Sequence, residues 1–448
     1  MAVTRSWERP GTALASRPEK PPVPPERRRE RLLLLAASVL AACGLALVLR
    51  AKIPGEPAGV LLLRRGVSAE QIRAVAGPEH AAAIAAEIES RGGLPSVGVL
   101  AKSGIPVSRV KPFLIVRTRT EYVRQAAYWL ALYFAAFWTV HLLWRWRRFR
   151  GDPWLLPVVH VLTGFGLALA LTLRDPLRDT LEFSKFSWGA ALGCALLVLP
   201  LVRGWDHRRW SAWVYTPLLA AFALLVLLLV RGSGPAGNSA KVNLGPVQPI
   251  EAIKILLVFF VAGYFASKWE WLRELRERRL PRGLRWLDLP RFTQALPVMC
   301  AVAAALVLLF LLKDLGPALV VGFLFLGMYA VARGRAALAI LGLVLVIAGV
   351  TVGYKLGAPA TVVGRVGMWL SPWNNDVRGG DQLAHAFWAL ATGGPFGSGP
   401  GRGDPALIPA GHTDLVLPAI GEEWGFCGVV AIGLLFGLLC ARALRAGL

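Results

Sequence analysis

Long apolar runs recur along nearly the whole chain, and they constrain the fold more than any other feature of the sequence. A helix needs about 17 to 25 largely apolar residues to cross a bilayer core of about 30 Å. Ten runs are apolar and long enough to approach or meet this length, at residues 32–50, 125–144, 153–173, 186–203, 211–231, 249–267, 293–312, 315–332, 335–354 and 415–440. These runs predict an all-α polytopic membrane protein with about ten transmembrane helices.

The composition excludes an ordinary soluble domain, because 55% of the 448 residues are hydrophobic and the mean hydropathy is +0.53. A formal net charge of +23 raises nucleic acid as a partner, but the basic residues lie mostly at the ends of the apolar runs. We therefore predict anionic membrane lipids and no nucleic acid as partners. The segment KWEWLRELRERRLPRGLRWLDLPR, residues 268–291, is typical of a helix in the membrane interface, although a solvated loop is the alternative.

Basic clusters in the loops predict the orientation, because Lys and Arg near the ends of membrane helices stay on the cytoplasmic side. Four clusters fall on alternate loops, at residues 144–150, 203–209, 268–291 and 333–335. With these loops inside, the basic, Pro-rich tail at 1–31 and the C-terminus are also cytoplasmic. The first run, 32–50, is long for a signal peptide and is interpreted as a retained helix.

Two regions outside the apolar runs are then extracytoplasmic, at 51–124 and 355–414. The first is predicted to be a small α+β element, with helices from Ser68 and near His80, and with a strand-like run, FLIVRTRTEY, at 113–122. Residues 125–448 form the polytopic domain.

The second region, 355–414, has a composition that a simple connector does not require. Aromatic residues at 369, 373, 387 and 388 provide surface for packing or for an apolar ligand. DQLAHAFWALAT at 381–392 reads as a short amphipathic helix, and the six glycines between 393 and 403 permit tight turns. The region is predicted to be a folded, re-entrant loop.

Local motifs give no support to the chemistry of soluble enzymes. The sequence contains no CxxC, P-loop, HExxH or GxSxG pattern. Its five cysteines lie in or at the edges of apolar runs without metal-ligand spacing, so we interpret them as packing residues and assign no metal ligand.

Four motifs, in order, resemble the SEDS family, the RodA/FtsW type of peptidoglycan glycosyltransferase. They are QPIEAIK at 248–254, KDLGPALV at 313–320, SPWNNDVRGGDQLAHAFWALATGGPFGSGPG at 371–401 and IPAGHTDLVLPAIGEEWGFCG at 408–428. The resemblance covers about residues 150–440. The family's last two helices, with Asn-x-Gly and Pro-Leu-Pro-Phe motifs, do not occur before Leu448, so we expect a fragment of a longer chain or a divergent member.

The resemblance implies an activity in the bacterial cytoplasmic membrane. Such enzymes polymerise lipid II, a lipid-linked disaccharide, at the outer face, and polyprenyl diphosphate leaves. A carboxylate must take the proton of the acceptor hydroxyl, and a cationic group or a metal must hold the diphosphate. A divalent cation, Mg²⁺ or Mn²⁺, is thus an expected cofactor, and a class B penicillin-binding protein an expected partner.

The resemblance assigns the catalytic base to Asp376, which matches the family's loop aspartate. A turn-forming aspartate after two asparagines is the alternative interpretation, and Asp381 reads as a helix cap ahead of Gln382. The residues expected to bind the substrate are Glu251, Lys254, Arg378, Gln382, Arg402, His412 and Asp414.

These assignments rest on different grounds. Glu251 and Lys254 lie three residues apart on one helical face, where a structural salt bridge is the alternative. Arg378 and Arg402 are chosen by charge as diphosphate contacts, and the remaining three residues by their place in the motifs. Two other functions stay open: a flippase for the lipid-linked precursor, and a non-catalytic scaffold for a penicillin-binding protein.

Overall fold

The computed structural model describes most of the helical part of the chain. The described residues are 24–53, 119–173, 181–203, 213–234, 241, 243–245, 248–268, 292–312, 315–333, 336–373, 380–411 and 413–447. They divide into two compact units, one made of Met1–Gly204 with Met368–Leu448 and the other of Trp205–Gly367.

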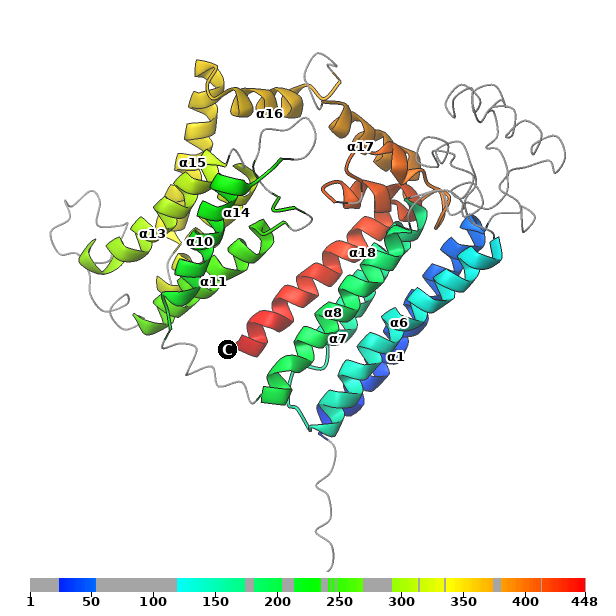
Figure 1. Cartoon of the computed structure of the whole chain (residues 1–448). Helices are drawn as coiled ribbons and strands as arrows, with labels where there is room; N and C mark the ends of the chain where they lie inside the picture. Colours follow the sequence, from blue (N-terminus) through cyan, green and yellow to red (C-terminus); the bar gives the residue numbers. More distant parts are fainter. Residues whose placement is uncertain are drawn as a thin grey trace, which may run out of the picture. The chain divides into compact units, whose positions relative to one another are not determined.

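The first unit is a bundle of long helices with a short helix and a loop at one end (Figure 1). Its elements are α1 (Pro25–Lys52), α6 (Arg119–Trp146), α7 (Leu155–Thr172), α8 (Glu182–Arg203), α17 (Gly380–Gly393), the 3₁₀ turn η3 (Pro405–Leu407) and α18 (Val416–Gly447). Helix α7 is central, because it packs against α1, α8 and α18, while α6 packs mainly against α8. Helix α17 packs against α18.

The core of this bundle is aromatic. Tyr133 and Phe137 of α6 are buried and lie against the ring of His160 on α7. The Tyr133 hydroxyl donates to the His160 carbonyl at 2.6 Å, so its polar end is satisfied among apolar neighbours. Many large apolar side chains on the outer faces of the helices stay exposed, as expected of helices that face lipid.

A buried ionic cluster joins the start of α1 to the end of α6. Arg27 forms an ion pair with Glu30 and donates to the Gly151 carbonyl at 2.7 Å. The second oxygen of Glu30 lies 2.6 Å from Nδ1 of His141, and all three side chains are fully buried. Helix α1 begins at Pro25, ahead of the apolar run at 32–50. Its first two turns belong to the packed bundle, because Arg27 and Glu30 are buried there.

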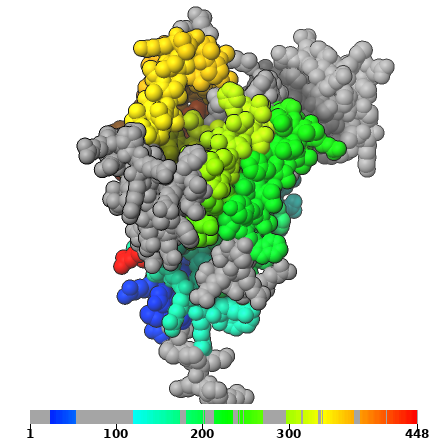
Figure 2. Space-filling model, turned by 90° about the vertical axis from the view of Figure 1, so that its left-hand side faces the viewer, coloured from blue at the N-terminus to red at the C-terminus, as the bar shows by residue number. Residues whose placement is uncertain are grey.

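The second unit contains α10 (Thr216–Arg231), α11 (Ile250–Ser267), α13 (Phe292–Leu311), α14 (Leu315–Arg333), α15 (Ala337–Leu356) and most of α16 (Ala360–Leu370). Helix α11 packs against α10 and α14, and α13 packs against α10 and α14. Figure 2 shows the green and yellow-green side chains of this unit against one another on one face. The rings of Phe265, Phe325 and Tyr329 pack against one another, tilted or edge-on, at the contact of α11 with α14.

The prediction of a helical multi-pass membrane protein is confirmed, and each of the ten predicted spans coincides with a helix. In the part of the chain that the structure describes, seven helices are long and apolar enough to cross a membrane: α1, α6, α7, α8, α11, α15 and α18. The apolar parts of α10, α13 and α14 are shorter, so a count of ten crossings stays a prediction.

Some predictions fall outside the described residues, and one is corrected. Residues 54–118, which hold most of the predicted outer element, and residues 269–291 of the predicted interface helix are not described. The strand-like run at 113–122 is wrong for its last four residues, which form the first turn of α6. Tyr122 and Ala126 are buried there at helical spacing, and Tyr122 packs edge-on against Phe183.

Candidate functional site

Helix α18 is interrupted at Gly425, in the first third of its length. This residue has φ 68° and ψ −170°, far from helical values. The interruption frees the carbonyls of Glu422 and Glu423 on one side, and the N–H groups of Phe426 and Cys427 on the other. Free backbone groups inside a packed protein must find other partners.

The loop after α17 supplies partners for all four groups. Ser398 and Gly399 donate their N–H groups to the carbonyls of Glu422 and Glu423 at 2.9 and 3.0 Å. The N–H groups of Phe426 and Cys427 donate to the carbonyls of residues 394 and 395 at 2.8 and 3.1 Å. The loop is thus docked backbone to backbone into the break of α18, which explains why irregular backbone is tolerated in a membrane protein here.

Glycine is required at this contact for two reasons. Gly397 has φ 86°, a region that other residues rarely adopt, and a Cβ atom there would lie 2.2 Å from the Glu423 carbonyl oxygen. A Cβ atom on Gly425 would lie 2.4 Å from the nitrogen of Gly397. The prediction that the glycines at 393–403 permit turns which other residues resist is therefore confirmed at Gly397.

Two acidic side chains of α18 lie under the continuation of the loop. Oε2 of Glu423, a residue only 1% exposed, accepts from the Gly401 N–H at 3.0 Å, and Oε1 of Glu422 accepts from the Asp404 N–H at 3.2 Å. A Cβ atom on Gly403 would lie 2.8 Å from Cγ of Glu423. The carboxylates therefore hold the second half of the loop, a function that the sequence alone did not show.

Helix α17 is the amphipathic helix predicted from the sequence. Its alanines at 384, 386 and 389 are buried, while the ring of Trp373 lies tilted against the exposed rings of Phe387 and Trp388, with ring centroids 6.0 Å apart in each pair. The helix begins at Gly380, so Asp381 lies in its first turn. The prediction that Asp381 caps the helix is wrong. A carboxylate in the first turn still stabilises the helix, because its negative charge lies near the positive end of the helix dipole.

The structure places three of the predicted site residues in the first unit. Gln382 is half-buried in the first turn of α17, and Arg402 is exposed in the loop that covers the two carboxylates. Asp414 is exposed two residues before α18. The predicted catalytic Asp376, together with Arg378 and His412, lies outside the described residues.

Glu251 and Lys254 belong to the second unit, at the start of α11. Their side chains form an ion pair of 2.7 Å, with Glu251 68% exposed and Lys254 25% exposed. The prediction that they share a helical face is confirmed, and their role in substrate binding stays a prediction. Among the described residues of both units, no group of three or more His, Cys, Asp or Glu side chains is placed to hold a metal ion.

The end of α1 is a part of the site that the sequence did not indicate. A Cβ atom on Gly401 would lie 2.9 Å from Cβ of Ala51 and 3.0 Å from the Val48 carbonyl oxygen. The loop is thus held between the end of α1 and the carboxylates of α18. The order of the motifs gave no signal of this contact, because α1 precedes the part of the chain that carries them.

Known proteins resemble this chain over most of its length. A family model for FtsW, RodA and SpoVE, described as "Cell cycle protein", matches residues 156–448. The peptidoglycan glycosyltransferase RodA of Mycobacterium leprae is 32% identical over 356 residues, which are 76% of this chain and 74% of that protein. RodA of Mycobacterium tuberculosis is 32% identical over 311 residues, 66% of this chain and 64% of that protein. Stage V sporulation protein E of Bacillus subtilis is 28% identical over 265 residues, 57% of this chain and 67% of that protein.

Proposed function

This chain belongs to the FtsW, RodA and SpoVE family, and from that premise we propose that it is a peptidoglycan glycosyltransferase. It joins lipid II, a lipid-linked disaccharide, into glycan strands at the outer face of the bacterial cytoplasmic membrane. Two relatives with this named activity align with 76% and 66% of the chain. The docked loop is the observation that carries the proposal. There, two of the motifs that resemble the family, at 371–401 and 408–428, are joined by backbone hydrogen bonds in one folded arrangement.

The proposed topology has ten membrane crossings with both ends of the chain in the cytoplasm. Its support is the alternation of basic loops between the helices. On this topology the tail at 1–31 is cytoplasmic, and the element at 51–124 and the loop at 355–414 are extracytoplasmic. The loop then faces the side on which lipid-linked precursors are polymerised.

The proposed chemistry is displacement at an anomeric carbon. The carboxylate of Asp376 takes the proton from the acceptor hydroxyl, while the hydroxyl oxygen forms a bond to the anomeric carbon of the growing chain. The bond between that carbon and the diphosphate breaks, and polyprenyl diphosphate carries away the electron pair. Asp376 lies four residues before α17 in the sequence.

The leaving diphosphate carries negative charge that must be held. Arg378 and Arg402 are proposed to contact it, together with Mg²⁺ or Mn²⁺ bound through the diphosphate oxygens. Gln382, His412 and Asp414 are proposed to bind the sugars.

The pair Glu251 and Lys254 is proposed as a further substrate contact. A class B penicillin-binding protein is the proposed protein partner, and the basic segment at 268–291 is proposed to bind anionic lipids. Nucleic acid is not a proposed partner.

Reconstitution tests the proposal. The purified chain is placed in liposomes with fluorescent lipid-linked disaccharide and Mg²⁺ or Mn²⁺, and the products are separated by length on a gel. We expect long glycan strands. Transfer of the fluorescent headgroup across the bilayer without any strand would instead indicate a flippase. Neither product, with retained binding of a penicillin-binding protein, would indicate a scaffold.

A further inference from the structure

The two carboxylates under the loop each leave one oxygen without a partner. Glu423 accepts from the Gly401 N–H through Oε2, and Glu422 accepts from a loop N–H through Oε1. The other two oxygens, Oε1 of Glu423 and Oε2 of Glu422, are buried and have no hydrogen-bond partner among the described residues. A charge away from water is costly, so buried charges are usually paired or bound to a metal ion.

Both carboxylates face the same point of the loop. A Cβ atom on Gly403 would lie 3.3 Å from Oε2 of Glu422 and 2.8 Å from Cγ of Glu423. The loop backbone therefore lies directly against the two side chains. An ion held by both carboxylates would lie where α18 meets the loop.

A third oxygen comes from α7. Thr172 is 3% exposed, and its hydroxyl is close enough to act on the Glu423 carboxylate. The hydroxyl donates its one proton to the Leu169 carbonyl at 2.9 Å, so that proton is not available to Glu423. Thr172 thus presents oxygen lone pairs next to a carboxylate, an arrangement that suits a cation and not a hydrogen bond.

Positive charge from the protein does not balance the pair. Lys52, in the last turn of α1, acts electrostatically on Glu423 but gives its free oxygen no hydrogen bond. Arg402 is exposed, and its side chain lies near Gly399. One lysine cannot neutralise two carboxylates, so the pair keeps a negative charge that attracts a cation.

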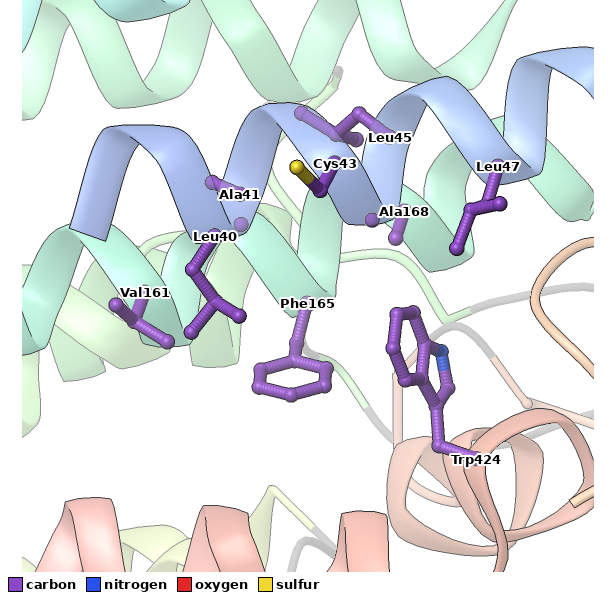
Figure 3. Close-up of a pocket in the computed structure, with 11 residues that line it drawn as sticks. Leu40, Ala41, Cys43, Leu45, Leu47, Val161, Phe165, Ala168 and Trp424 are labelled. Atoms are coloured by element: carbon purple, nitrogen blue, oxygen red, sulfur yellow. The ribbon is translucent and has the colours of Figure 1, made fainter. Parts of the chain in front are cut away.

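The segment that carries the carboxylates is fixed by its next residue, Trp424. Figure 3 shows Trp424 and Phe165 directed into the same apolar space beside α1. The two rings meet edge-on, with centroids 5.3 Å apart. The indole also fits against Gly44, where a Cβ atom would lie 3.1 Å away. This packing holds the carboxylates in position before any ion binds, and such preorganisation favours binding.

We propose that Glu422, Glu423 and Thr172 bind one divalent cation of the Mg²⁺ or Mn²⁺ class, and that this ion holds the loop against α18. These cations prefer oxygen ligands, and Mg²⁺ commonly uses one or two carboxylates with water in the remaining positions. The site therefore needs no group of three acidic or histidine side chains, which the described residues do not provide. The ion differs from the one proposed at the leaving diphosphate, and the site does not depend on the proposed function.

Hydrogen exchange in the unchanged chain tests whether an ion holds the loop. The amides of Gly401 and Asp404, which donate to the two carboxylates, are followed at constant ionic strength while Mg²⁺ replaces Na⁺. An ion that binds only the docked loop lowers the open population in proportion to its concentration above the dissociation constant. We expect exchange at these amides to slow about tenfold for each tenfold rise in Mg²⁺ in that range, and exchange in α11 to stay unchanged.

Two results of this experiment would overturn the proposal. Exchange at Gly401 and Asp404 that does not respond to Mg²⁺ or Mn²⁺ would show that no ion holds the loop. Exchange that depends on pH beyond its intrinsic rate, and not on either ion, would show that a proton occupies the carboxylate pair instead.

Electron paramagnetic resonance measures binding directly, because the sharp signal of free Mn²⁺ is lost when the ion binds. Glu423→Gln keeps the shape of the side chain and an oxygen for the Gly401 N–H but removes the charge. Glu26→Gln removes the same charge in the first turn of α1 and is the control. We expect Glu423→Gln to weaken Mn²⁺ binding about tenfold or more, and Glu26→Gln to bind as the unchanged chain does.

Glu422→Gln keeps the test decisive if Glu423→Gln does not fold, because Glu422 is the less buried of the two. We expect the same loss of Mn²⁺ binding in this variant. Binding by both variants equal to that of Glu26→Gln would show an adventitious ion only and would contradict the site.

These measurements contain no lipid-linked substrate and are separate from polymerisation. A chain that binds the ion as expected but makes no strands keeps the site and contradicts the proposed function. A chain that makes strands without an ion at Glu422 and Glu423 does the reverse.

Discussion

Replacing Gly397 by alanine tests the docking of the loop into α18. The left-handed backbone at this residue, φ 86°, costs a non-glycine residue about 1–2 kcal/mol. The added Cβ atom would lie 2.2 Å from the Glu423 carbonyl oxygen, so the loop must withdraw. It then loses the hydrogen bonds from Ser398 and Gly399 at 2.9 and 3.0 Å, each worth about 1 kcal/mol. We expect the loop to open more easily by about 3–4 kcal/mol in total.

Alanine substitutions at two other glycines separate the backbone strain from the steric clash of the added Cβ atom. Gly394 also has a positive φ, 52°, but a Cβ atom there meets nothing within 4 Å, so Gly394→Ala adds backbone strain alone. Gly433 lies in the helical part of α18 with open space around it, and alanine there favours the helix by about 1 kcal/mol.

Hydrogen exchange of the amides at 396–402 is the assay. Exchange through local opening accelerates about tenfold for each 1.4 kcal/mol. We expect Gly397→Ala to accelerate it by about two orders of magnitude or more, Gly394→Ala by about tenfold, and Gly433→Ala not at all. Exchange in Gly397→Ala no faster than in Gly394→Ala would refute the close backbone contact.

Three further predictions concern the rest of the molecule. Glu30→Gln leaves the buried guanidinium of Arg27 without its counter-ion and should lower the free energy of unfolding by about 3–5 kcal/mol. Glu26→Gln, near the same helix start, should lower it by less than about 1 kcal/mol. Equal thermal midpoints of the two variants would contradict the buried cluster. Lys254→Gln breaks an ion pair whose glutamate is exposed and whose lysine is partly exposed, and should change stability by less than about 1 kcal/mol. A large loss of polymerisation at unchanged stability would therefore mark a role in substrate binding, and unchanged polymerisation would leave only the salt bridge. In intact cells, a cysteine replacing the exposed Thr413 should react with an impermeant thiol reagent and one replacing Gly283 should not; the opposite pattern would reverse the proposed orientation.

Much of the helical fold could be predicted from local sequence. Apolar length predicted the long helices, because a run that must cross a bilayer has few alternatives to a helix. Helical spacing predicted α17, and it also placed Glu251 and Lys254 on one face of α11, since both features depend on residues close in the chain. The strand prediction for the run at 113–122 was wrong at its end, because four alternating residues fit a strand and the first turn of a helix equally well.

The features that depend on distant partners could not be predicted. Gly425 breaks α18, while Gly433 and Gly437 in the same helix do not. All three are glycines in an apolar run, and only Gly425 has a docked loop that replaces the lost hydrogen bonds. Glu30 also depends on a distant partner. From the sequence it reads as part of the basic tail, because its partner His141 lies 111 residues away.

The rate of glycan polymerisation by the Asp376→Asn variant is the most direct measurement of the proposed activity. The change keeps the size of the side chain and its preference for turns but removes the basic carboxylate, so we expect a loss of about 10²- to 10⁴-fold at unchanged stability. Asp381→Asn is the matched control. That residue lies in the first turn of α17, where loss of its charge costs about 0.3–1 kcal/mol, and strands should still form at a rate near that of the unchanged chain. Near-normal polymerisation by Asp376→Asn, or an equal loss in both variants, would contradict catalysis by Asp376.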